Sequence, residues 1–266
     1  MTLTTKITGG FSEHITCQLD PGQSVFAEAG KFRWKTVNVA METRLSTPGG
    51  VADQANKQAQ QGGSFLKAAL ATATEVGKRV ISGQSLAFQW FSPSGGAGLV
   101  SFAGDEPGQV RAIELESGVG WRAESRALIC AESSVHYDID WAGFNLGRRS
   151  KEGFIFEHFT GVGTVVVAGG GSLMDMNPAD YGGKIQIHAG AVVAFADSVK
   201  FSVERIGSLN AQTIMTAAFG GTGINMVTLS GDGPVVLQST LHRRFENENR
   251  DDQGNDTRLD GFLGRL

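Results

Sequence analysis

Apolar and polar positions alternate along this chain in short runs, and glycine turns separate the runs in pairs. The clearest pair spans 152–167, where Gly161-Val162-Gly163 lies between an alternating run and a second apolar run. The segments 222–237 and 85–102 have the same plan. Because successive side chains of a strand point to opposite faces, such alternation predicts half-buried strands. We therefore predict three copies of a strand, a glycine hairpin turn and a second strand.

A second motif precedes each of these pairs. Near the N-terminus an alternating run ends at the turn Asp20-Pro21-Gly22-Gln23, and Gly30 follows Gly22 by eight positions. When the three segments are aligned, the same spacing separates Gly118 from Arg126 and Gly182 from Gly190. Since Arg126 replaces a glycine, we expect that a positive φ is not required there. Each repeat then consists of two linked hairpin-like halves.

The alignment of these halves also predicts buried positions. It places Val25, Trp121 and Ile185 at one equivalent position, which marks Trp121 as a core residue. The glycines of the turns recur at 65 and 70 positions, from Gly98 to Gly163 and on to Gly233. This period predicts internal repeats over about 11–103, 104–168 and 169–240, within one compact all-β domain covering 1–240.

Two stretches depart from the repeat. The first repeat carries an insertion at about 46–80, and Ser64 followed by apolar residues at helical spacing predicts a helix over 64–76. The stretch 241–266 is dense in Asn, Asp, Glu and Arg, which predicts a mobile tail. Between the second and third repeats, 168–172 is expected to be a flexible connector and 174–178 a turn.

Composition and charge narrow the class of protein. The chain has 266 residues and 37 glycines, and its net charge of −4 gives no overall basic field for nucleic acid. The two cysteines, Cys17 and Cys130, lie far apart without metal-ligand spacing and favour a reducing compartment. We find no signal-peptide pattern and no apolar run of about 18 residues. The expectation is a cytoplasmic protein without a transmembrane segment.

No motif in the sequence carries a recognisable chemistry. Gly161-Val162-Gly163 leads into a strand and not a helix, which argues against a dinucleotide fingerprint. The histidines show no metal-ligand spacing, and His158 and His188 are expected at a surface or an interface. Asp138 and Asp140 share one strand face and could bind a cation, although a solvated face is the default. We predict no catalytic residues, no metal site and no cofactor.

One basic loop leaves an alternative open. Arg148, Arg149 and Lys151 lie in the glycine-containing stretch 143–151, and the connector Gly169-Gly170-Gly171 is a further candidate feature for binding. Such a loop could hold an anion, although a solvated loop is the simpler interpretation. The alternatives to a structural protein are therefore a small-ligand or nucleic-acid binder that uses clefts between barrels, or an unrecognised hydrolase or metal-dependent enzyme.

The repeated halves, the Gly-x-Gly turns and the closing stretch 231–239 together resemble the altered-inheritance-of-mitochondria family, member twenty-four. This family is also called tryptophan RNA-binding attenuator protein-like, or TRAP-like. The resemblance covers about 10–240 and includes 62–67 and 82–86. It implies a double-stranded β-helix or β-prism built from three TRAP-like repeats with pseudo-threefold symmetry.

The resemblance also implies assembly into a ring, with a homotrimer favoured. Bacterial members of the family have no settled biochemical function, and a mitochondrial member is associated with inner-membrane organisation. The residues with which the attenuator protein binds tryptophan and RNA have no counterparts at any position of this chain. Nucleic acid is therefore not expected as a partner. The function expected from the sequence is a non-enzymatic oligomeric scaffold or interaction protein whose binding residues are unknown.

Overall fold

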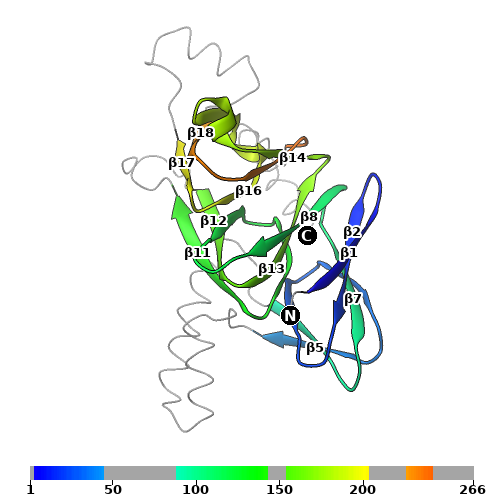
Figure 1. The fold of residues 1–266 in the computed structure, drawn as a ribbon. Helices are drawn as coiled ribbons and strands as arrows, with labels where there is room; N and C mark the ends of the chain where they lie inside the picture. The colour runs from blue at the N-terminus through cyan, green and yellow to red at the C-terminus, as the bar shows by residue number, and fades with distance from the viewer. Residues whose placement is uncertain (1–2, 45–87, 143–153, 204–225, 242–266) are drawn as a thin grey trace, which may run out of the picture.

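The computed structural model describes residues 3–44, 88–142, 154–203 and 226–241, and these form an all-β protein (Figure 1). Only two short 3-10 helices occur in these ranges, and no described helix is long and apolar enough to cross a membrane. The strands are β1 Thr4–Gly9, β2 Glu13–Leu19, β3 Val25–Glu28, β4 Phe32–Lys35, β5 Val39–Arg44, β6 Phe88–Pro93, β7 Gly98–Ala103, β8 Gly108–Leu115, β9 Trp121–Glu124, β10 Leu128–Glu132, β11 Val135–Ala142, β12 Phe154–Gly161, β13 Gly163–Gly170, β14 Leu173–Met176, β15 Lys184–His188, β16 Val192–Ala196, β17 Val199–Val203, β18 Met226–Gly231 and β19 Val235–Gln238. The 3-10 helices are η1 Pro178–Tyr181 and η2 Ala189–Ala191.

The strands form four antiparallel sheets. Their orders are β1-β2-β7-β4, β5-β6-β3-β10-β13-β8, β11-β12-β9-β16-β19-β14 and β15-β18-β17. The two six-stranded sheets are each built from parts of the chain far apart in sequence, joined where β3 pairs with β10 and where β9 pairs with β16.

One order of pairing recurs in three successive segments of six strands, β2–β7, β8–β13 and β14–β19. In each segment the sixth strand lies between the first and the third, and the fifth lies between the fourth and the second. Figure 1 shows the segments following one another, from blue through green to yellow and orange. The second strand of one segment pairs with the third strand of the next, so the sheets run continuously from segment to segment.

The glycine turns connect different sheets and are not hairpins, so this prediction was wrong. β12 pairs with β11 and β9, whereas β13 follows it after one residue and pairs with β10 and β8. Gly161 and Gly163 have φ angles of 101° and 146°, which allow the chain to bend sharply between the sheets. A Cβ at Gly163 would lie 2.7 Å from Ser134 Oγ, so the corner also has no room for a larger residue.

The prediction for Arg126 was also wrong. Its φ is 110°, close to the 93° of Gly30, which precedes the third strand of the first segment in the same way. The backbone conformation of the turn is therefore kept although the residue has a side chain. Gly190 does not share this positive φ: it lies in η2, where its N–H donates to His188 Nδ1 at 3.1 Å. The turn can thus be built in two ways.

The predicted connector and turn after the second repeat are replaced by strands. Ala168, Gly169 and Gly170 belong to β13, and β14 covers Leu173–Met176. Close packing explains the glycines: a Cβ at Gly169 would lie 2.6 Å from Leu173 Cδ2. Glycine clusters here signal crowded backbone and not flexible chain. The turn Asp20–Gln23 is as predicted, with the Gln23 N–H donating to Asp20 O at 2.9 Å.

The apolar core is shared between the segments. One cluster joins β3 and β6 of the first segment to β10 and β13 of the second and to β16 and β19 of the third. A second cluster joins the first segment to β8, β10 and β13, and a third holds the last segment with Phe156 of β12. Trp121 is only partly buried and packs against the first cluster. The largest fully buried side chains include Phe26, Phe88, Phe91, Phe102, Phe156, Phe159 and Phe195.

Several sequence predictions lie outside the described residues. They are the insertion at 46–80 with its helix at 64–76, the basic loop from 143 to 151, and the tail from 242 onward. The boundaries of the repeats stay a prediction.

Candidate functional site

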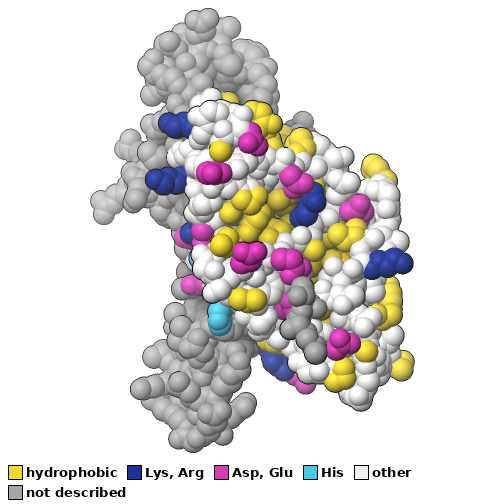
Figure 2. Space-filling model, in the orientation of Figure 1, with side chains coloured by type: hydrophobic (Ala, Val, Ile, Leu, Met, Phe, Trp, Pro, Cys, Tyr) yellow, Lys and Arg dark blue, Asp and Glu magenta, His cyan; other side chains and the backbone are white. Residues whose placement is uncertain are grey.

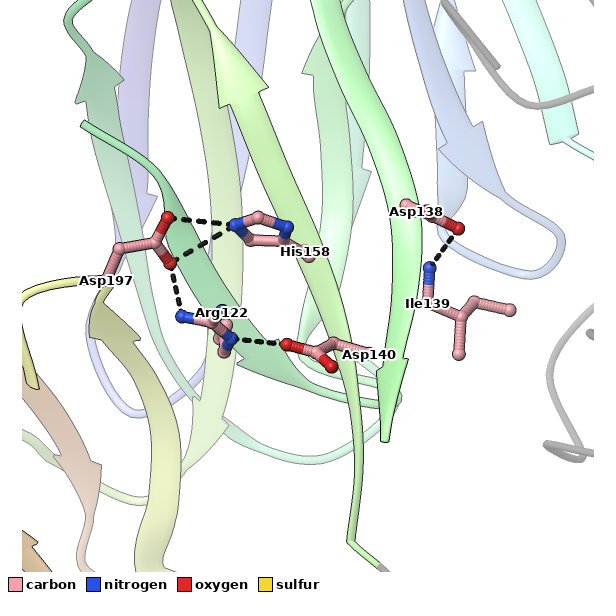
Figure 3. A network of polar contacts seen from close by, with 6 residues as sticks. All are labelled: Arg122, Asp138, Ile139, Asp140, His158 and Asp197. Carbon is pink, nitrogen blue, oxygen red and sulfur yellow. Dashed lines mark hydrogen bonds and ion pairs between the residues drawn. The ribbon is translucent and has the colours of Figure 1, made fainter. Parts of the chain in front are cut away.

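A connected group of charged side chains surrounds Arg122 of β9 (Figure 3). Its Nε donates to Asp140 Oδ2 at 2.7 Å, and its Nη1 forms an ion pair with Asp197. His158 Nε2 lies 3.1 Å and 3.0 Å from the two carboxylate oxygens of Asp197. The four side chains therefore form one continuous chain of contacts, Asp140–Arg122–Asp197–His158.

Strand pairing brings these residues together. Within the sheet, β9 lies between β12 and β16, and Arg122 stands opposite His158 on β12 and Phe195 on β16. Asp140 comes from β11, the next strand beyond β12, and Asp197 follows the end of β16. The group thus connects the second segment to the third at the pairing of β9 with β16.

The absence of a side chain at Gly120 leaves room for the carboxylate of Asp197. The Asp197 N–H donates to Gly120 O at 2.9 Å, which fixes the backbone beside β9. A Cβ at Gly120 would lie 2.2 Å from Asp197 Oδ2 and 2.9 Å from His158 Nε2. Any larger residue at 120 would displace the carboxylate from both of its partners.

The two aspartates that share a strand in the sequence contact different partners. Asp138 and Asp140 share a strand face as predicted, yet their carboxylates have different partners. Asp140 pairs with Arg122, whereas Asp138 Oδ1 accepts from the neighbouring Ile139 N–H at 2.8 Å (Figure 3). Across the four described ranges, no three His, Cys, Asp or Glu residues cluster as metal ligands.

The contact between His158 and Asp197 resembles part of a catalytic dyad, and here it also joins two segments. A histidine held by a carboxylate can activate a hydroxyl or thiol within hydrogen-bond reach. Among the described hydrogen bonds, those of the His158 ring run to Asp197 alone. Arg122 is a quarter exposed and its partners are more exposed, so solvent screening limits each ion pair to about 1 kcal/mol or less.

A small hollow lies where the first two segments meet. It is lined by Asp105, Glu106, Arg126 and 168–170. Beside it Lys31, which is 2% exposed, donates from Nζ to Asp105 Oδ2 at 2.6 Å and to Arg126 O at 3.2 Å. Lys31 thereby holds the strained backbone of Arg126 in place.

The two cysteines lie together in the core, which sequence spacing did not predict. Cys17 is on β2 and Cys130 on β10, and both are free and fully buried in the second cluster. Burial raises the pKa of the Cys130 thiol well above its ordinary value, and its hydrogen bond with Cys17 raises it further. Neither thiol is placed to act as a nucleophile on an outside substrate.

The remaining residues that the sequence singled out lie at separate places in the structure. His158 is partly buried at the junction of two segments, while His188 Nδ1 accepts from a backbone N–H at the start of η2. The glycines Gly169 and Gly170 lie in β13 beside the small hollow, and Arg148, Arg149 and Lys151 lie outside the described residues.

Sequence reasoning missed Arg122 and Asp197 as a pair. They are 75 positions apart and belong to different segments. The available signal was the polar residue Arg122 where the aligned first segment has Phe26, since a charge in a core-like strand requires a partner.

Comparison with known proteins agrees with the fold. A protein of Streptococcus pyogenes serotype M6, described as uncharacterized, is 25% identical over 233 residues, covering 87% of this chain and 83% of that protein. A crystal structure of a Streptococcus pyogenes protein, a structural genomics target, matches with a TM-score of 0.65 and 21% identity over 94% of this chain and 99% of that one. The sequence profile of the family described as Mitochondrial biogenesis AIM24 matches residues 5–240. This chain belongs to the AIM24 family.

Proposed function

We propose that this protein is a non-enzymatic, homo-oligomeric scaffold, with a trimer as the favoured assembly. The observation that supports it is the use of the charged groups: the network around Arg122 and the hydrogen bond from Lys31 Nζ to Arg126 O both connect one segment to another. The described polar side chains of these clusters thus hold strands together.

The surface supports the same proposal. On the face shown in Figure 2, basic and acidic side chains are scattered among one another and no basic stripe is formed. Nucleic-acid binding depends on a concentrated positive field, which this face does not offer. Apolar side chains gather near the centre of the same face.

We further infer that the three six-strand segments are TRAP-like repeats, supported by their shared order of pairing. Their pseudo-threefold relation stays a prediction. We place the protein in the cytoplasm, because its two cysteines are close together and unpaired, as expected in a reducing compartment.

Size-exclusion chromatography with light scattering tests the proposal, with bound small molecules, metals and nucleic acid assayed on the same peak. We expect a trimer of the 28.1 kDa chain that carries no stoichiometric ligand. A monomer at micromolar concentration would remove the basis of the scaffold. A stoichiometric ligand or nucleic acid would replace it with a binding function.

A further inference from the structure

The two joints between segments have the same register. At the first, Ala27 of β3 stands opposite Cys130 of β10, with Phe26–Ala131 and Val25–Glu132 beside it. At the second, the pairs between β9 and β16 are Ala123–Ala194, Arg122–Phe195 and Trp121–Ala196. In each case the second strand of one segment pairs antiparallel with the third strand of the next.

A β-bulge identifies equivalent positions on the third strands. The register with the sixth strand shifts between Phe32 and Trp34 in β4. The same shift occurs between Leu128 and Cys130 in β10 and between Val192 and Ala194 in β16. Trp34 is therefore equivalent to Cys130 and Ala194, the residues that occupy the joints.

Pairing with the fifth strands aligns the second strands in the same way. Val25 stands opposite Phe91, Trp121 opposite Phe159, and Ile185 opposite Leu229. Ile185 is thus equivalent to Val25 and Trp121, and Ile187 is equivalent to Ala27 and Ala123. The joints predict which residues of β15 would meet which residues of β4.

Within the described residues, β4 and β15 are sheet edges and lie in different sheets. β4 is the third strand of the first segment and β15 the second strand of the last, so each belongs to the type of strand that forms a joint. In Figure 1 the sheet containing β7 and the sheet containing β17 and β18 lie at opposite ends of the molecule. Pairing the two edges with each other therefore requires a second copy of the chain.

Both edges carry exposed apolar side chains. Trp34 is 44% exposed on β4 and Val37 beyond it is fully exposed. At the other end, η1 packs against β15 and presents Tyr181, which is 59% exposed. Tryptophan and tyrosine are enriched where protein interfaces gain their energy, and an open sheet edge is a template for another strand.

We propose that chains associate head to tail, with β4 of one copy pairing antiparallel with β15 of the next. The register places Trp34 opposite Ile187, Lys35 opposite Gln186 and Thr36 opposite Ile185. This proposal rests on the homo-oligomeric function proposed above and names its interface. Because one contact uses two different patches, repetition generates a closed ring when the rotation between copies closes.

One hydrogen bond of the joint can be specified. The Ser133 N–H donates to Ser24 O, and the Asp197 N–H donates to Gly120 O, both at 2.9 Å. These residues come just after the third strand and just before the second strand. The equivalent bond in the new interface runs from the N–H of Val37 to the carbonyl of Lys184 in the neighbouring copy.

Disulfide cross-linking of the full chain tests this register. Directly opposed residues of antiparallel strands lie about 4.5–5.5 Å apart between Cα atoms, within the range for a disulfide. Oxidation of Trp34→Cys/Ile187→Cys should give covalent oligomers on non-reducing gels. In the control Lys35→Cys/Ile187→Cys, the first thiol points to the opposite sheet face and should give at least tenfold less product.

Each outcome decides the proposal. Circular dichroism verifies that each variant is folded. If replacement of Trp34 prevents folding, Thr36→Cys/Ile185→Cys provides a second in-register pair. Covalent oligomers from an in-register pair but not from the control support the interface. A cross-link within one chain would overturn the proposal that the two strands pair between two copies. An oligomer by light scattering without cross-links overturns the register alone, whereas a monomer overturns the proposed function as well.

Discussion

Arg126 offers the sharpest test of the backbone argument. Its φ of 110° lies where residues with a Cβ are strained, and glycine is not. Residues held in such regions cost about 1–3 kcal/mol each. The side chain is exposed, and the contact that holds the turn, from Lys31 Nζ to Arg126 O, uses a backbone carbonyl. Replacement by glycine removes the strain and keeps this hydrogen bond.

The expected gain can be worked out from two opposing terms. Release of backbone strain stabilises the folded state by about 1–3 kcal/mol. The greater conformational freedom of glycine stabilises the unfolded chain by about 0.5–1 kcal/mol, which opposes this gain. Arg126→Gly should therefore raise the free energy of unfolding by about 1 kcal/mol, which corresponds to roughly 2–4 °C in Tm for a chain of this size class. Urea denaturation followed by circular dichroism measures the change.

The equivalent turn of the first segment supplies the matched control. Gly30 has a φ of 93°, and a Cβ built there meets nothing within 4 Å. Gly30→Arg should thus destabilise through backbone strain alone, by about 1 kcal/mol or more. If Arg126→Gly lowers stability by 1 kcal/mol, or if Gly30→Arg leaves it unchanged, the account of these turns is wrong.

Three other predictions concern packing, charge and the thiols. Gly108→Ala should cost about 3 kcal/mol in urea unfolding, because its Cβ would lie 1.9 Å from a backbone oxygen, whereas Gly96→Ala, in open space, should change little. Arg122→Met should cost about 1–2 kcal/mol, and a loss that did not shrink in 1 M salt would argue against ion pairing. Cys17 and Cys130 should resist a thiol reagent in the native protein and react on unfolding. Since the folded pKa of Cys130 is raised, the unfolded chain releases this proton first, and stability should fall as pH rises above about 8.5.

The sequence predicted the strands better than it predicted their partners. Alternation and turn residues identified most strand positions, including the run at Ile15, Cys17 and Leu19, whose side chains are all buried. Pairing is a relation between distant residues, and a glycine turn between two runs is compatible with a hairpin or with a corner between sheets. Gly161 and Gly163 form such a corner, and their spacing alone does not distinguish the two.

The candidate site was less predictable for the same reason. Asp138 and Asp140 were recognised because they are neighbours in sequence, yet only Asp140 joins the network around Arg122. Asp197 enters it from another segment, through pairing of β9 with β16. The glycine-rich stretch at 168–171 suggested flexibility, whereas the packing of Gly169 against Leu173 shows that small size was the property required.

A native mass spectrum of the full chain tests the central claim most directly, since it reports stoichiometry and bound mass together. The account predicts one dominant species at three times the 28.1 kDa chain mass, with no additional mass. A monomer at micromolar concentration, or an assembly that carries a stoichiometric ligand, would contradict the scaffold.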